Sequence, residues 1–401
     1  GDIVAAGVSG GNYGYTLMWI MVLALSVRIF FVSMIAKYQL YNQHDEGVLD
    51  GLARLHRWYP PFLVLVVVVM GHVFGAYLSA GMGEAWVKLT GWGQTWQWAS
   101  LWNAIILALI FRAVYGRVER VFKAFLVLLS VSLIGTAIWV GPSLAGILKG
   151  TFAFEWPARE GPFGSLLIAM GMLGTVTGSI MNLVYPYFLE EKGWRGKSYR
   201  RLQLYDLMLA AVVLIVLNLS VWTLGAELIY SQGQTVQDLD GLTDLLGGVL
   251  GEGGRVLFLL GIFAAVFTSI LGVALGLATL GCHCYLRWRT GRSPAPSDYQ
   301  SGRCYQVILI WILVSPLVWT FPGMPGFITL TLIASCLQVL LVPFLAGGIW
   351  WITAGTRYIG AAHRNGWGAN LFMALLLAVS LWGTMRSVRA VAEEVQKLVT
   401  R

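Results

Sequence analysis

Long apolar runs alternate with short polar stretches along the whole chain. A membrane-spanning helix needs about 20 mostly apolar residues, and ten runs reach or approach that length. We expect spans at residues 15–38, 61–80, 101–115, 121–140, 163–189, 204–230, 256–286, 305–321, 327–353 and 370–385. The longer connections, at residues 41–58, 142–162 and 231–254, are predicted to be loops. The glycine-rich residues 1–13 are predicted to be half of a helix whose beginning is missing from this numbering.

One run departs from a plain apolar span. Between Gly171 and Ser179, three glycines and three hydroxyl residues fall within nine positions. Glycine weakens a helix by about 1 kcal/mol per position, and Ser and Thr hydroxyls bond the backbone groups that an opened helix frees. We interpret this stretch as an unwound break in the span 163–189. Transporters bind ions at such breaks; the alternative is a helix crossing that is packed closely through small residues.

Composition indicates a polytopic membrane protein with a single transmembrane domain. The chain is 57% hydrophobic and only 11% charged. Its formal charge of +8 does not point to nucleic acid, because the basic residues lie in short loops. With the loop after Tyr38 placed in the cytoplasm, 18 of them fall on the cytoplasmic side and 4 on the outer side. This bias follows the positive-inside rule, although the basic tail at residues 386–401 falls on the outer side, as a surface helix or a miscounted span would explain. We expect an integral protein of the bacterial inner (plasma) membrane, surrounded by the lipid bilayer, with no obligate protein partner.

Few residues suggest other chemistry. The sequence holds no nucleophile–base pair, P-loop or zinc-protease motif, so we predict no enzyme activity and no resident cofactor. Cys282-His283-Cys284 lacks a matching second pair, and the four cysteines imply no disulfide framework. Arg28 lies inside a span, where it is expected to pair with an acid or to extend toward the interface. His72 is expected to be a hydrogen-bonded packing residue, with a proton relay as the alternative.

Several motifs resemble the Nramp family of divalent-metal transporters, in an order and spacing that cover nearly the whole chain. Residues 14–19 are similar to the stretch that opens the family's second helix, which places Gly1-Asp2 on the last two residues of its Asp-Pro-Gly-Asn motif. Residues 174–180 fall on its Gly-Ala-Thr-Val-Met-Pro-His motif, and residues 264–272 look like the eighth-helix motif of divergent members.

The resemblance implies an all-α LeuT-type fold that works by alternating access. It also implies two inverted five-helix repeats, at residues 1–140 and 163–355, an extra helix at residues 370–385, and a metal site between the first and sixth helices. Three positions depart from the family: Asp2 stands where it has Asn, Gly178 replaces a methionine whose sulfur favours softer metals, and Ile180 replaces a histidine linked to proton movement.

Asp2 is the only carboxylate that we place deep in the membrane, where a charge is expensive and usually functional; the alternative is that it caps the half-helix. The candidate metal ligands all offer oxygen, and they are Asp2, Thr175, Thr177, Gly178, Ser179, Thr268, Ser269 and Gln338. Oxygen ligands suit Mg²⁺, Mn²⁺ and Ca²⁺, and the room expected at Gly178 suits a partly hydrated ion.

We therefore expect a secondary transporter of divalent metal cations, Mg²⁺ or Mn²⁺, similar to the magnesium-transporting relatives of Nramp proteins. Tight proton coupling is not expected, because Ile180 cannot titrate. One alternative is an organic-solute symporter on the same fold, for an amino acid or an amine. Another is a membrane receptor or scaffold without transport, which substrate-dependent flux would distinguish from both.

Overall fold

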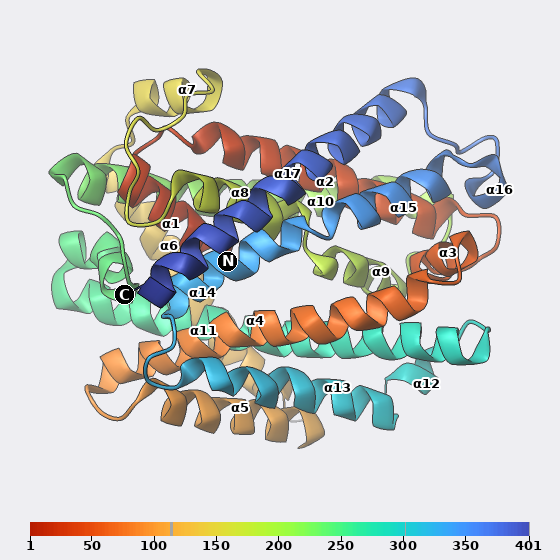
Figure 1. The fold of residues 1–401 in the computed structure, drawn as a ribbon, viewed down its shortest axis with the longest axis horizontal. Helices are drawn as coiled ribbons and strands as arrows, with labels where there is room; N and C mark the ends of the chain where they lie inside the picture. The colour runs from red at the N-terminus through yellow and green to blue at the C-terminus, as the bar shows by residue number, and fades with distance from the viewer. Residues whose placement is uncertain (113–114, 301, 401) are drawn as a thin grey trace.

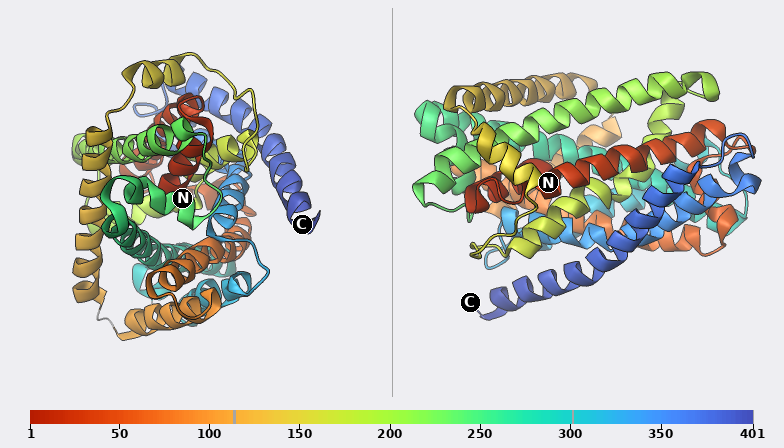
Figure 2. Two further views of the ribbon diagram at one scale, coloured as in Figure 1. Left: turned by 90° about the vertical axis from the view of Figure 1, so that its left-hand side faces the viewer. Right: turned by 90° about the horizontal axis from the view of Figure 1, so that it is seen from above.

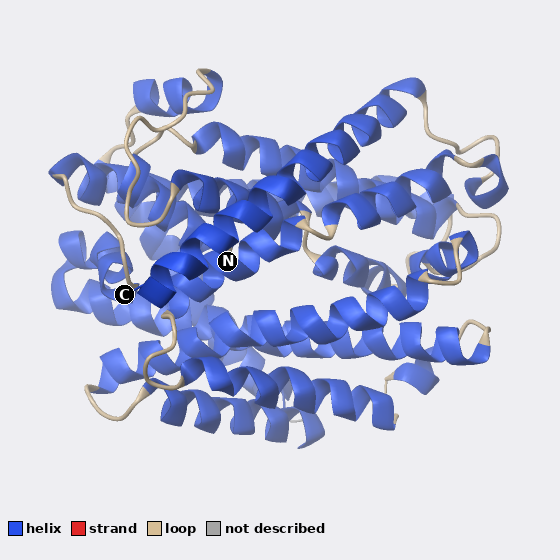
Figure 3. Cartoon of the chain, viewed as in Figure 1, coloured by secondary structure: helices blue, strands red, loops and turns tan. Residues whose placement is uncertain are grey.

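The computed structural model of the chain describes residues 1–112, 115–300 and 302–400, and its regular elements there are all helical (Figure 3). Five of the long apolar spans in this part of the chain are single elements: α2 (Met18–Tyr41), α4 (Tyr59–Thr90), α6 (Tyr115–Val140), α11 (Leu239–Thr290) and α17 (Trp367–Thr400). Four further apolar spans are built from consecutive pieces: α8 (Ser165–Thr177), η1 (Ile180–Val184) and α9 (Tyr185–Glu191); α10 (Arg200–Leu224) with short turns on either side; α13 (Arg303–Val314) and η5 (Ser315–Thr320); and α14 (Phe327–Val339) and α15 (Val342–Ala354).

The remaining helices are shorter. α1 (Asp2–Tyr13) is a short helix within the residues where half of a helix was expected, and α5 (Thr95–Arg112) is a shorter apolar helix. Short helices also lie in the connections: α3 (Val48–Leu55), α7 (Leu144–Phe152), α12 (Pro296–Tyr299) and α16 (Thr356–Ile359). Single turns lie at η2 (Lys197–Tyr199), η3 (Gly225–Ile229) and η4 (Tyr230–Gln232).

Most of the long helices run side by side along the long axis of the molecule, and α17 crosses them obliquely (Figures 1 and 2). α4 packs along α11, and α8 packs on α14. α1 contacts α8, α10 and α14, and the mark for the N-terminus lies near the middle of the long axis in Figure 1. Asp2, the first residue of α1, therefore sits at mid-depth in the bundle.

Local sequence explains where two of these elements begin and where one bends. Ser143 and Asp238 cap α7 and α11, because their side chains accept hydrogen bonds from the N–H groups of Gly146 and Gly241. α11 bends at Gly251, whose φ of 62° and ψ of −150° are readily adopted by glycine alone. The bend separates a short first arm of α11 from the apolar span that follows.

The predicted helical membrane fold is confirmed. Nine helical segments among the described residues are long and apolar enough to cross a membrane, and α5 supplies the short tenth span.

Three predicted loops are wrong in part, because α3, α7 and the first arm of α11 lie within them. In α3 the reason is an apolar face: Val48, Leu49 and Leu52 are all buried. The basic tail continues α17 as far as Thr400, whereas the span predicted from the sequence ended at residue 385. The repeat boundaries stay a prediction.

Candidate metal site

The break predicted in the span 163–189 is present. α8 ends at Thr177, and the N–H of Gly178 donates to the carbonyl of Gly174 to close its last turn. Ser179 then begins the short helix η1, because its hydroxyl oxygen accepts a 3.3 Å hydrogen bond from the N–H of Met181. The hydroxyl of Ser179 is therefore partly used by the backbone that follows the break.

The other interpretation of this stretch, close packing of helices through small residues, also applies here, between α8 and α14. A Cβ on Gly174 would collide with the carbonyl oxygen of Ser335, and a Cβ on Gly178 with that of Gln338. Glycine is needed at both positions because the backbones of α8 and α14 come together there. The expectation that Gly178 leaves room in the site is wrong, since α14 fills that space.

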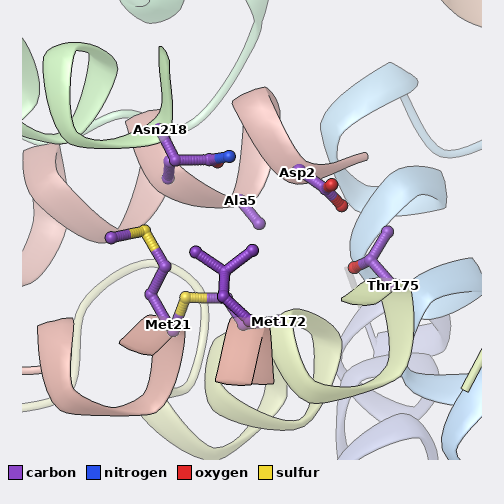
Figure 4. A pocket seen from close by; sticks show the side chains of 8 residues that line it. Asp2, Ala5, Met21, Met172, Thr175 and Asn218 are labelled. Carbon is purple, nitrogen blue, oxygen red and sulfur yellow. The ribbon is translucent and has the colours of Figure 1, made fainter. Parts of the chain in front are cut away.

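A small pocket lies beside this break, between α1, α2, α8 and α10. Its lining residues are Asp2, Ala5, Ala6, Met21, Leu25, Met172, Thr175 and Asn218. Figure 4 shows Asp2 and Thr175 at one end of the pocket and the sulfur-bearing side chains of Met21 and Met172 toward the other. The centre of a water-sized sphere has about 10 Å³ in which to move, which is close to the least that one water molecule needs.

Asp2 is the first residue of α1, and Gly1 occupies the N-cap position. The Asp2 carboxylate faces a cation: Oδ2 lies 3.6 Å from Nη1 of Arg28 on α2. The side chains of Asp2 and Arg28 are 21% and 37% exposed, so the pair is partly open to solvent. The expectation that Arg28 pairs with an acid is confirmed.

The structure brings together only some of the predicted ligands. Asp2 and Thr175 both line the pocket, and the Thr175 hydroxyl donates to the Gly171 carbonyl, which leaves its oxygen lone pairs available. The side chain of Thr177 lies outside the described part of the structure. Gly178, Ser179 and Gln338 do not line this pocket.

Two predicted ligands on α11 also lie away from the pocket lining. Thr268 donates its hydroxyl to the carbonyls of Ala264 and Ala265, at 2.9 and 3.2 Å, and Ser269 is exposed. Gln338 on α14 is buried and donates to the Ala334 carbonyl at 3.5 Å. A role for these three residues in metal binding stays a prediction.

Sequence reasoning missed the two thioethers. Met172 lies inside the glycine-rich stretch 171–179, and Met21 follows the second-helix motif at residues 14–19. Both were missed because methionine is a common apolar residue in membrane spans. Asn218 also lines the pocket, and it donates to the Leu214 carbonyl of its own helix. The statement that every candidate ligand is oxygen is therefore wrong for this pocket.

His72 is a hydrogen-bonded packing residue, as expected. Its Nδ1 lies 2.9 Å from the Ser315 hydroxyl, and the indole N–H of Trp319 donates to its Nε2 at 2.8 Å. Among the described residues, no group of three or more His, Cys, Asp or Glu side chains is placed so that it could hold a metal ion.

A polar cavity of about 590 Å³ lies at the predicted cytoplasmic end, between α3, α9, α11 and α12. The carboxylate of Asp50 is almost fully buried there, 3.0 Å from Nε of Arg287 and 3.5 Å from Nε2 of His283, and it accepts a 2.6 Å hydrogen bond from Ser293. Burial alone would raise the pKa of Asp50, but His283, Ser293 and the Arg287 charge together hold it below its ordinary value.

The C-terminal end of α1, away from Asp2, is held in place by hydrogen bonds of Asn12 and Tyr13. Asn12 pairs with the backbone of Val236, donating at 3.0 Å and accepting at 2.7 Å. The Tyr13 hydroxyl donates to the Phe163 carbonyl at 2.5 Å and accepts from the N–H of Gly161 at 2.9 Å. The predicted outer end of α1 is thus joined to the segments before α8 and α11, whereas the wide polar cavity lies at the other end of the bundle.

Comparison with known proteins gives a consistent result. A family model described as natural resistance-associated macrophage protein-like (Nramp) matches residues 1–388. The divalent metal cation transporters MntH of Bacillus subtilis and Pectobacterium carotovorum are 22% and 23% identical to this chain over 280 and 276 residues. These matches cover 65% and 67% of this chain, and 62% and 65% of the relatives, so slightly less than two thirds of each relative is spanned.

Solved structures agree on the fold. A variant of the Eremococcus coleocola manganese transporter has a TM-score of 0.69 at 15% identity, covering 99% of this chain and 90% of its own. MhsT, solved in complex with L-phenylalanine, has a TM-score of 0.57 at 15% identity, covering 97% of each chain. The LeuT-type helical fold is confirmed, as is an integral membrane protein of bacterial inner-membrane type. With the family model matching 388 of 401 residues, the chain belongs to the Nramp family.

Proposed function

We propose that this chain carries a divalent metal cation across the membrane by alternating access and prefers Mn²⁺ to Mg²⁺. The observation that carries the proposal is the pocket at mid-depth, where the Asp2 carboxylate, Thr175 and two thioethers lie together beside the break in α8. A carboxylate in the middle of an apolar bundle is expensive to keep unless it binds a cation or pairs with one.

The lining of the pocket supports Mn²⁺ over Mg²⁺ for two reasons. The thioether sulfurs of Met21 and Met172 are soft ligands, which add little to the binding of Mg²⁺ but more to a transition metal. Mg²⁺ also gives up its water molecules reluctantly, and this pocket has room for about one. These two observations replace the all-oxygen argument from the sequence, which left Mg²⁺ and Mn²⁺ equal.

Transport without tight proton coupling is part of the proposal. The position that matches the histidine of the family's broken-helix motif is Ile180, which is fully buried and has no titratable proton. An organic-solute symporter is not favoured, because the pocket is far too small for an amino acid and the curated relatives are named metal cation transporters.

The test is metal uptake into proteoliposomes, with Mn²⁺, Mg²⁺ and Ca²⁺ compared and the internal pH recorded at the same time. We expect saturable Mn²⁺ entry, slower Mg²⁺ entry and no acidification. Protein-free liposomes and the Asp2→Ala variant, which removes the ligand oxygens, serve as controls. Acidification that follows the metal would refute uncoupled transport, and faster Mg²⁺ than Mn²⁺ entry would refute the preference. If none of the three metals enters, the metal function is refuted, and uptake of an organic amine is the next assay.

A further inference from the structure

The guanidinium group of Arg28 lies beside Asp2, the proposed metal ligand. Arg28 lies in the interior of α2, whose only other charged residue is Lys37, three turns nearer the cytoplasmic end. A guanidinium at that depth needs a partner, and its Nη1 lies 3.6 Å from Oδ2 of Asp2. In this conformation, therefore, the negative charge of Asp2 is balanced by an arginine rather than by a metal.

Arg28 also belongs to the face of α2 that forms the pocket. Met21 and Leu25 line the pocket, and Arg28 follows them at seven and three residues, the spacing that puts three side chains on one side of a helix. More than a third of the Arg28 side chain is exposed. A long arginine side chain in this setting can turn its charged end away toward water while its stem stays in place.

We propose that Arg28 is a tethered cation that neutralises Asp2 when the site is empty and leaves it when a divalent metal binds. The proposal rests on the proposed metal function and adds a residue that sets its affinity and its cycle. With Arg28 against Asp2, the charges of these two residues offset each other. With metal bound, the guanidinium and the metal repel each other at this range, so Arg28 must move.

Two consequences follow for transport. Metal binds Asp2 only in the fraction of molecules in which Arg28 has turned away, so an Arg28 that occupies Asp2 nine-tenths of the time raises the apparent dissociation constant about tenfold. The empty carrier also has to reorient for net uptake but not for exchange of one metal ion for another. Pairing Asp2 with Arg28 makes reorientation of the metal-free carrier easier, because an unpaired Asp2 charge in the bundle is expensive.

The test compares the wild type with Arg28→Gln, Arg28→Lys and the matched control Lys37→Gln, which removes the other cation of α2 and lies away from Asp2, hydrogen-bonded to Asn365. Two rates are measured in proteoliposomes: net Mn²⁺ entry into empty vesicles, and entry of labelled Mn²⁺ into vesicles preloaded with Mn²⁺. For Arg28→Gln we expect a half-saturating Mn²⁺ concentration about tenfold lower, a slower maximal net uptake, and exchange that persists. Arg28→Lys restores the balance between net uptake and exchange, and Lys37→Gln behaves as the wild type.

Each other outcome has a definite meaning. An Arg28→Gln variant with the wild-type half-saturating concentration and the wild-type ratio of net uptake to exchange refutes the tethered-cation role while leaving the metal function intact. Loss of both rates in an Arg28→Gln protein that elutes as the wild type does, and is not restored in Arg28→Lys, also refutes it, because a packing role then suffices. Absence of Mn²⁺ flux in the wild type refutes the proposed function, and this inference with it.

Discussion

Replacing Gly178 by methionine, the residue that the family motif has there, tests how α8 is held at its break. A side chain at this position points into α14: its Cβ would collide with the carbonyl oxygen of Gln338 and would lie 2.9 Å from Cγ2 of Val342. A backbone carbonyl inside a helix cannot move aside as a flexible side chain can. Gly178→Met is therefore expected to push α8 and α14 apart rather than to add a sulfur ligand to the pocket.

The size of the effect follows from the contacts. Extra atoms forced into a packed interior cost about 1–3 kcal/mol, occasionally more, and methionine adds three heavy atoms beyond Cβ. We expect about 1–2 kcal/mol for Gly178→Ala and about 3 kcal/mol or more for Gly178→Met. Since each 1.4 kcal/mol is a factor of about ten, the methionine variant is expected to hold the packed break about a hundredfold less often relative to the separated state.

The assay has two parts. Heat inactivation of the purified protein in detergent, compared between variants at a fixed heating time, reports stability even if unfolding is irreversible. Mn²⁺ and Mg²⁺ uptake in proteoliposomes report the site. The matched control is Gly272→Ala in the membrane-spanning part of α11, where a Cβ meets nothing within 4 Å; we expect it to be neutral or stabilising by up to about 1 kcal/mol.

One result would refute this reasoning. If Gly178→Met keeps the heat stability of the wild type and changes only the ratio of Mn²⁺ to Mg²⁺ uptake, then the side chain enters the site and α14 does not occupy that space. A loss of stability in Gly178→Met that Gly272→Ala shares would also count against it, because the cost would then come from any added side chain in a span.

Three further predictions concern single groups. Asp2→Ala removes both the charge and the ligand oxygens, and we expect Mn²⁺ uptake to fall at least about tenfold in a protein that elutes normally; uptake equal to the wild type would contradict the site. Met172→Leu conserves volume, so its stability cost should be below about 1.5 kcal/mol, while the Mn²⁺ to Mg²⁺ uptake ratio falls; an unchanged ratio would argue against a sulfur ligand. Because the pKa of Asp50 is lowered in the fold, its ion pairs stabilise the protein above the unfolded value of about 3.9 and are lost as pH falls through the lower folded value. Heat stability measured from pH 6 to pH 2.5 should therefore decline less steeply in Asp50→Asn than in the wild type, and parallel curves would contradict this.

The fold was predictable because the bilayer imposes a length and a composition on every span. The apolar runs alone located nine long segments and the short α5. Connections were harder, because a short amphipathic helix such as α3 is set by the few residues that it buries against the bundle, here Val48, Leu49 and Leu52. Helix ends followed special residues: Gly251 bends α11 through a positive φ, and a glycine there is visible in the sequence only as one among 48.

The candidate site was predictable in part. Asp2 and Thr175 stood out because a carboxylate and a cluster of hydroxyl and glycine residues are rare in apolar spans. Met21 and Met172 did not, because a methionine is ordinary in a span and only the crossing of α1, α2 and α8 brings both into the pocket that Asp2 lines. Gly178 was assigned the wrong consequence, since a glycine in sequence looks like free space whether or not another backbone occupies it.

These observations make α14 the element that sets the spacing of the pocket. α8 is held on α14 through Gly174 and Gly178, and Thr175 lies between those two contacts. The start of α1 meets the same two helices, because a Cβ on Gly1 would lie 2.5 Å from Cγ2 of Thr175 and 3.6 Å from Oγ of Ser335. The distance between Asp2 and Thr175 is therefore fixed by how α1 and α8 sit on one surface of α14. Any tilt of α1 or α8 relative to α14 must change that distance, so binding a metal across Asp2 and Thr175 favours one arrangement of the three helices over others.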